Sequence, residues 1–142
     1  LEPSLAEIRN AVVEIRKGKF PPLSAFGTAG SFFLNPIVAE DGVAELRARF
    51  PEMPVFVLPE GGVKVPLAWL FDHVLHIQGM REGSAFVWEK QPLVLAADPG
   101  ATSAVVRALA QKIAQMLHEK TGIIILPEVR VLSADKKNIS QK

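Results

Sequence analysis

Cysteine and tyrosine are both absent from this chain of 142 residues. Without thiols the protein forms no disulfide and has no thiolate nucleophile or thiolate metal ligand, and a cysteine-free sequence suits a reducing compartment. Long hydrophobic runs are missing too: hydrophobic residues make up 49% of the sequence, yet no uninterrupted apolar stretch approaches the roughly 20 residues that cross a bilayer. We therefore expect a cytoplasmic protein with no membrane partner.

A dominant charge is missing as well. The chain has 16 basic and 15 acidic residues, for a net charge of +1, so it lacks the basic surface that nucleic acids require. His73 and His76 are three positions apart and could contact one ion from the face of a helix. With no cysteine and no clear third ligand, we expect neither a metal site nor a nucleic-acid partner.

What remains is typical of one compact domain. The length is enough for a single hydrophobic core and too small for two domains. The first ten residues, LEPSLAEIRN, are charged and helical in pattern, unlike a signal peptide. The chain begins with Leu1 instead of Met, as a piece of a longer polypeptide would. We expect one unit over residues 1–142, with a polar tail at 133–142.

The spacing of apolar residues predicts four helices. The first is expected over 4–17, because Ser4 and Glu7 form a capping box and Gly18 supplies a stop. Its apolar stripe, expected to be buried, consists of Leu5, Ile8, Val12 and Ile15. The other three helices are expected over 40–50, 66–75 and 102–120. Gly122 is expected to cap the last of them.

Short runs of β-branched and aromatic residues predict the strands. The expected strands cover residues 31–34, 37–38, 54–58, 63–65, 85–89, 92–97, 123–126 and 129–132. A turn at 59–62 would make a hairpin of two of them, and QGMREG at 78–83 is expected to be a loop. We therefore predict an α+β fold: a single compact domain with short mixed or antiparallel strands and three to four helices.

One stretch has two interpretations. GTAGSFFLNP, residues 27–36, places two glycines and a hydroxyl directly before a pair of phenylalanines. It is either a turn that feeds a buried strand, which is the commoner case, or a loop that holds Ser31 against a ligand. Composition and spacing do not decide between the two.

A series of motifs in a fixed order favours the second interpretation. The motifs are IRKGKFP, AGSFFLNP, GGVKVPLAWLFD, GMREG, KQPLVL and HEKTGIIILPEVRVL. Together, from about Ile8 to Leu132, they resemble the C-terminal part of UDP-N-acetylenolpyruvoylglucosamine reductase, the flavoenzyme that makes UDP-N-acetylmuramate for bacterial peptidoglycan. The resemblance implies the third, substrate-covering domain of an enzyme whose two N-terminal lobes hold FAD.

The resemblance also implies a reaction and the residues that serve it. In the family, FAD reduced by NADPH passes a hydride to the vinyl carbon of an enol ether, and a proton follows to the neighbouring carbon. Ser31 matches the family's proton donor, and Glu128 matches the glutamate that stabilises the developing carboxylate charge. Burial beside Pro127 and Val129 is expected to raise the pKa of Glu128. Gly30 is expected to let the flavin approach closely.

Substrate contacts follow from the same resemblance. The polar residues that match the family's contacts are Lys19, Asn35, Gln91 and Lys64. For Lys64 a structural role is the alternative. Leu34 and Gln78 stand where the family often has lysine, and a lost cation weakens diphosphate binding unless a neighbour such as Arg81 replaces it. In a chain without tyrosine, Phe56 is the aromatic nearest the second hairpin; it can stack but cannot donate a hydrogen bond.

The implied function is that of the substrate-binding and proton-donating domain of an FAD-dependent, NADPH-using UDP-N-acetylmuramate dehydrogenase. Its partners would be a UDP-sugar and its own flavin-binding lobes, and this chain alone is expected to be inactive. The alternative is a non-catalytic α+β module that binds a small ligand. The long stretch between Pro36 and Lys64 further predicts the family branch that carries an additional helix and strand.

Overall fold

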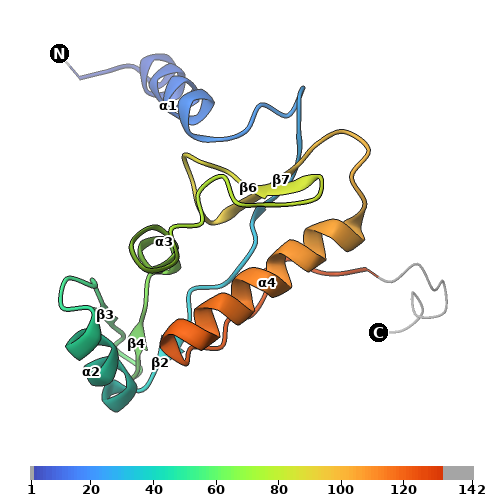
Figure 1. The fold of residues 1–142 in the computed structure, drawn as a ribbon. Coiled ribbons are helices and arrows are strands. Elements are labelled where there is room, and N and C mark those ends of the chain that lie inside the picture. Colours follow the sequence, from blue (N-terminus) through green and yellow to red (C-terminus); the bar gives the residue numbers. More distant parts are fainter. Residues whose placement is uncertain (1, 133–142) are drawn as a thin grey trace, which may run out of the picture.

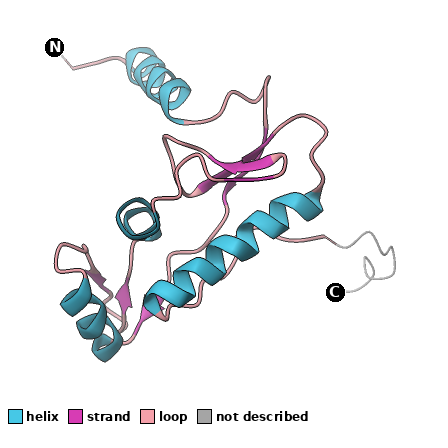
Figure 2. Cartoon of the chain, in the orientation of Figure 1, coloured by secondary structure: helices cyan, strands magenta, loops and turns pink. Residues whose placement is uncertain are grey.

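The structure, a computed structural model, describes residues 2–132 of the chain (Figures 1 and 2). The helices are α1 (Leu5–Lys19), α2 (Glu40–Arg49), α3 (Leu67–Leu70) and α4 (Ser103–Thr121), and a π-helical turn, η1 (Phe71–Leu75), directly continues α3. The strands are β1 (Gly27–Ser31), β2 (Ile37–Val38), β3 (Phe56–Val57), β4 (Val63–Lys64), β5 (Arg81–Glu82), β6 (Ala85–Val87) and β7 (Val94–Ala97). The pairs of these strands are antiparallel, and the predicted α+β class is confirmed. The predicted tail at 133–142 lies outside the described residues.

The larger sheet has the strand order β1-β7-β6-β5, and α4 packs against β5, β6 and β7. Every residue of β6 and β7 is buried, which explains why these strands appear in the sequence as unbroken apolar runs. Helix α4 contributes Leu109, Ile113 and Leu117 to the core, each with no exposed surface. Figure 1 shows α4 beside this sheet, and the longest helix therefore covers one of its faces.

The smaller sheet has the strand order β2-β4-β3. Val43 of α2, Val63 of β4 and Phe71 of η1 belong to the same cluster of buried side chains as the core residues of α4. The two sheets therefore share one hydrophobic core, as expected of a single domain. The stretch between Pro36 and Lys64 contains α2 and β3, while its assignment to one branch of the family stays a prediction.

Helix α1 begins as predicted and ends later. Ser4 and Glu7 form the capping box, but Gly18 lies inside the helix, which ends at Lys19 with Phe20 as its C-cap. The prediction that its apolar stripe is buried is wrong for this chain: the exposed fractions are 86% for Leu5, 46% for Ile8, 48% for Val12 and 67% for Ile15. Figure 1 shows the reason, because α1 stands clear of both sheets.

Three predicted strands are wrong. Strand β1 occupies the glycine-rich stretch itself and ends at Ser31, instead of covering 31–34. The segments 123–126 and 129–132 form no ladder either, and one isolated bridge, between Phe33 and Pro127, lies between them. Proline has no N–H to donate, so Pro127 contributes no donor of its own and only an isolated bridge forms there.

Two further segments differ from expectation in detail. Residues 81–82, predicted as part of a loop, pair with β6 as strand β5. The predicted helix at 66–75 divides into α3 and η1, and it ends where His76 adopts a left-handed conformation with φ of 51°. Among the described residues, no helix combines the length and the apolar character needed to cross a membrane.

Candidate functional site

Four of the predicted site residues line one hollow of about 460 Å³. They are Ser31, Asn35, Lys64 and Glu128, and they come from the end of β1, the segment after it, strand β4 and the segment that follows α4. The remaining lining is apolar: Phe33, Leu34, Ile37, Leu58 and Leu93. A hydroxyl, an amide, an ammonium and a carboxylate thus share one mostly apolar hollow.

Ser31 is set in place by an irregularity in β1. The strand pairs with β7, and the register shifts between Thr28 and Gly30, which marks a β-bulge. Gly30 sits in the left-handed region with φ of 68°, a conformation that favours glycine. This explains the pattern G-T-A-G before the serine: the stretch is neither a plain turn nor a loop but a bulged strand.

Glu128 reaches this place because the segment after α4 turns back along the sheet. Gly122 caps α4 with φ of 74°, as predicted, and the chain then runs beside the residues that follow β1. Leu34 N–H donates to the carbonyl of Leu126 (3.0 Å), and Glu128 N–H donates to the carbonyl of Phe32 (2.8 Å). The expected burial of Glu128 is wrong for this chain, since the residue is exposed.

Asn35 has a structural role in addition to its place in the hollow. Its Oδ1 accepts the N–H of Leu67, the first residue of α3, at 2.9 Å. Asn35 and Lys64 also line an adjoining hollow of about 400 Å³ that contains Phe56, so the two cavities adjoin along these residues. Phe56 is 56% exposed. The aromatic ring therefore lies where a ligand that extends past Lys64 would pass.

The structure does not bring Lys19 and Gln91 into the hollow. Both lie around Trp88: its indole Nε1 donates to the carbonyl of Lys19 (2.9 Å), and its own carbonyl accepts the N–H of Gln91 (3.2 Å). These contacts use the backbone of Lys19 and Gln91 and leave their side chains to other partners. Their predicted contact with a ligand therefore stays a prediction.

Positive charge is scarce in the hollow. Leu34, at a position where the resemblance implies lysine, lines it, and Lys64 is the one basic residue among its described lining residues. Arg81 does not replace the missing cation, because it forms a two-bond ion pair with Asp98 (2.9 and 3.2 Å) and lies over the ring of Phe86. The hydrogen bond with Asp98 raises the pKa of Arg81, and the same bond lowers the pKa of Asp98.

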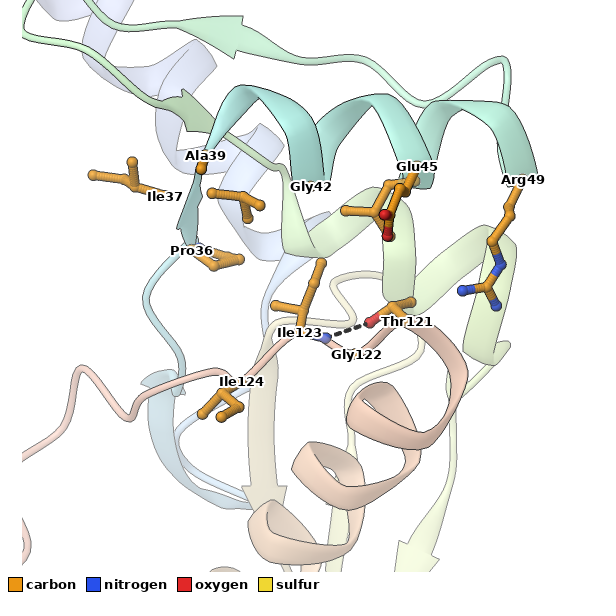
Figure 3. Close-up of a pocket in the computed structure, with 12 residues that line it drawn as sticks. Pro36, Ile37, Ala39, Gly42, Glu45, Arg49, Thr121, Gly122, Ile123 and Ile124 are labelled. Atoms are coloured by element: carbon orange, nitrogen blue, oxygen red, sulfur yellow. Dashed lines mark hydrogen bonds between the residues drawn. The ribbon is translucent and has the colours of Figure 1, made fainter.

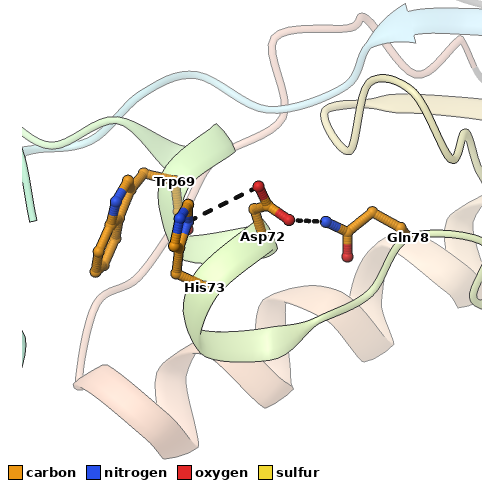
Figure 4. Close-up of polar contacts among 4 residues, drawn as sticks. All are labelled: Trp69, Asp72, His73 and Gln78. Carbon is orange, nitrogen blue, oxygen red and sulfur yellow. Dashed lines mark hydrogen bonds and ion pairs between the residues drawn. The ribbon is translucent and has the colours of Figure 1, made fainter.

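The two histidines serve the fold. The ring of His73 stacks on Trp69 at 4.6 Å with an interplanar angle of 6°, and its Nδ1 lies 3.1 Å from the Trp69 carbonyl (Figure 4). Gln78, the second position where lysine was expected, donates to Asp72 beside this stack (Figure 4). Within residues 2–132, no group of three or more histidine, aspartate and glutamate side chains could hold a metal ion.

Another hollow, of about 520 Å³, lies between α2 and the end of α4 (Figure 3). It contains none of the predicted site residues. Its polar lining includes Glu45 and Arg49 of α2 and Thr121, whose hydroxyl accepts the N–H of Ile123 at 3.1 Å. That bond belongs to the end of α4, so this hollow reflects how the helix terminates.

Comparison with known proteins gives the family. Residues 21–132 match the family model described as "UDP-N-acetylenolpyruvoylglucosamine reductase, C-terminal domain". Proteins named UDP-N-acetylenolpyruvoylglucosamine reductase are 39% identical over 132 residues in Porphyromonas gingivalis, 39% over 130 in Chromobacterium violaceum and 40% over 132 in Pseudoalteromonas atlantica. These matches cover 92–93% of this chain and 38–39% of each relative, so the chain spans well under half their length. The chain belongs to the family of the C-terminal domain of UDP-N-acetylenolpyruvoylglucosamine reductase.

Proposed function

We propose that this chain is the substrate-binding and proton-donating domain of a flavin-dependent, NADPH-using reductase that converts the enolpyruvyl ether of UDP-N-acetylglucosamine into UDP-N-acetylmuramate. The observation that carries the proposal is the single hollow that joins Ser31, Asn35, Lys64 and Glu128 from four separate segments. Family membership supports the same reaction. The lack of cysteine suits a reaction in the cytoplasm.

The residues of this chain fit a flavin that is held mainly by another part of the enzyme. A Cβ added at Gly30 would meet no atom within 4 Å, so that side of the bulge is open to a ring approaching from outside. The glycines at 27 and 30 serve a bulged strand, and not a loop before a helix that could hold a pyrophosphate. When bound, FAD supplies the hydride, after reduction by NADPH.

Ser31 and Glu128 serve the charge and the proton of the reaction. Hydride addition next to a carboxylate builds negative charge on the substrate, and the reaction needs donors fixed at that place and an acid. Ser31 donates the proton from its Oγ. Glu128 lies on the segment that pairs with Phe32, directly after Ser31, and stabilises the developing carboxylate charge through a water molecule.

Lys64 and Asn35 bind the diphosphate and its sugar. Lys64 takes no part in the four ion pairs of the described residues, so its ammonium is free to meet a phosphate. Asn35 donates through Nδ2, since its Oδ1 already accepts from Leu67. Lys19 and Gln91 contact a part of the substrate that lies outside the hollow, on the side of Trp88.

The flavin-binding part of the same polypeptide is the partner of helix α1. The exposed stripe of α1 contains Leu5 at 86% and Ile15 at 67%, and a helix with so much unburied apolar surface needs a covering surface. The relatives extend well beyond the matched region, since the match covers 38–39% of their length. That additional part supplies the surface.

The experiment is a comparison of Ser31→Ala with Ser103→Ala in the full-length enzyme. Ser103 is an exposed serine at the start of α4 and serves as the matched control. With Ser31→Ala, NADPH should reduce the flavin at the normal rate, while reoxidation by the enolpyruvyl substrate slows by about 10²–10⁴-fold, the usual loss for a missing general acid. Stopped-flow absorbance measures both steps. Normal reoxidation in Ser31→Ala would show that Ser31 is not the acid. A parent protein whose reduced flavin is not reoxidised by the enolpyruvyl substrate would favour the non-catalytic binding module.

A further inference from the structure

The hydroxyl of Thr28 makes two hydrogen bonds at the bulge that precedes Ser31. Its Oγ1 donates to the carbonyl oxygen of Leu95 in β7 at 2.9 Å, and it accepts the N–H of Gly30 at 2.9 Å. A hydroxyl can do both because it has one proton and two lone pairs. Thr28 thus ties the two sides of the bulge together.

The bulge decides which face of the strand Ser31 occupies. Thr28 pairs with Ala96, and this register, continued without a bulge, would set Ser31 opposite Leu93. The additional residue in β1 shifts Ser31 to a position opposite Val94. Because side chains alternate between the two faces of a strand, a shift of one residue reverses the face on which Ser31 lies.

A side chain bonds backbone groups on both strands at this bulge. The Leu95 side chain is 1% exposed, and its carbonyl is bonded by the Thr28 hydroxyl. The N–H of Gly30, turned by its φ of 68°, is bonded by the same oxygen. Removal of the hydroxyl would take one bond from each backbone group and weaken the hold on the conformation that precedes Ser31.

We propose that Thr28 is a positioning residue for Ser31: its hydroxyl holds the bulge that aims the serine into the hollow shared with Glu128. This rests on the proposed function, in which Ser31 donates the proton. Thr28 lines a different hollow from Ser31, so it acts on the reaction through the serine.

The test compares Thr28→Val, which keeps the shape and removes the hydroxyl, with Thr28→Ser, which keeps the hydroxyl. Thr121→Val is the matched control, because the Thr121 hydroxyl makes the same pair of bonds away from the site. It donates to the Leu117 carbonyl at 2.7 Å. It also accepts the N–H of Ile123 at 3.1 Å (Figure 3). Both valine variants should lower the thermal unfolding midpoint of the full-length enzyme by similar amounts.

The rates should separate the two threonines. With Thr28→Val, reoxidation by the enolpyruvyl substrate should slow by about 10- to 100-fold, as misplacement of a reacting group by about 1 Å does. Flavin reduction by NADPH and substrate affinity, the latter from titration of the oxidised enzyme, should change less than about twofold. Thr28→Ser should restore most of the rate, and Thr121→Val should not affect it. A normal reoxidation rate in Thr28→Val, or an equal loss in Thr121→Val, would overturn the proposal.

A double variant tests whether the effect passes through the serine. In the Ser31→Ala background, Thr28→Val should cause no further loss of rate, because the group that it positions is gone. A full additional loss there would show a general effect on the fold and would overturn the proposal. If Thr28→Val does not fold, Thr28→Cys, whose thiol is a weak hydrogen-bonding group, is compared with Thr28→Ser, and equal rates would overturn it. A normal rate in Ser31→Ala alone would refute the proposed function instead.

Discussion

Asn35 offers a way to separate the stability of the domain from its binding of substrate. Its Oδ1 accepts the N–H of Leu67, while its Nδ2 makes no hydrogen bond among the described residues. Asn35→Ala removes both groups. Asn35→Asp keeps an oxygen for the Leu67 N–H and replaces the donor with a negative charge. Asn35→Ala should therefore destabilise the domain while Asn35→Asp should not, and both variants should weaken binding.

The size of the stability effect follows from the burial of Leu67. Its side chain has no exposed surface, and the residue before it, Pro66, gives α3 no side-chain cap. A buried N–H left without a partner costs about 1–3 kcal/mol, and because Asn35 is half-buried we expect a loss in the lower part of that range, about 1–2 kcal/mol, for Asn35→Ala. For Asn35→Asp we expect a change within about 0.5 kcal/mol, because a carboxylate oxygen accepts at least as well as an amide oxygen.

Urea unfolding of the 142-residue chain measures stability, and titration of the full-length protein with the proposed UDP-sugar substrate measures binding. At ordinary urea sensitivities, Asn35→Ala should lower the midpoint by roughly 0.5–1 M. Both variants should bind substrate at least about tenfold more weakly, or 1.4 kcal/mol. Asn10→Ala, on the exposed helix α1, is the control and should not lose stability. Equal destabilisation by Asn35→Ala and Asn35→Asp would refute the role of Oδ1.

Three further predictions follow. If Glu128 serves charge that appears only in the transition state, Glu128→Gln should lose less reoxidation rate than Glu128→Ala, with near-normal affinity in both; equal losses in affinity and rate would make it a docking residue. Ile15→Gln should change the free energy of unfolding of the 142-residue chain by less than about 0.5 kcal/mol, because Ile15 is exposed there, and should destabilise the full-length enzyme by about 1.5–3 kcal/mol. A loss of stability in the 142-residue chain would contradict the exposure of this stripe. Arg81 lowers the pKa of Asp98, so the pair stabilises the fold above about pH 4, and this stabilisation is lost as the pH falls below that value. The urea midpoint should therefore change less between pH 5 and pH 3 in Asp98→Asn than in the parent. An equal change in both would contradict this role of the pair.

Helices were predicted better than strands, and the reason is local. The capping box at Ser4 and the glycine cap at Gly122 act within one turn, so the sequence alone contains the signal. The strands at 123–126 and 129–132 were predicted from β-branched composition, but composition cannot tell whether a partner strand is present. Pro127 was the one residue in the sequence that indicated an interrupted ladder, because proline has no N–H to donate. The exposed stripe of α1 was predicted as buried because the pattern of a helix does not say where its covering surface lies.

The site was predicted through resemblance more than through residues. The hydroxyl of Ser31 and the carboxylate of Glu128 are far apart in the sequence, and no local pattern predicts that the segment after α4 returns to pair beside Phe32. Thr28 was missed, although a hydroxyl between two glycines is a usable signal of a side chain that bonds nearby backbone groups. Arg81 was named only as a possible replacement for the missing cation, and the sequence could not show its pairing with Asp98, which depends on the turn after β7.

The segment at 126–128 pairs beside the residues that follow β1 but is synthesised long after them. Synthesis proceeds from the N-terminus, so β1 and the two phenylalanines that follow it leave the ribosome well before β7, α4 and the segment that carries Glu128 exist. Phe32 and Phe33, each 5% exposed in the finished domain, have no partner strand during that interval. Pairings between such distant segments form slowly. In a growing chain, the stretch that carries Ser31 is therefore among the last to complete its pairing, and until then its two phenylalanines stay exposed to non-native contacts.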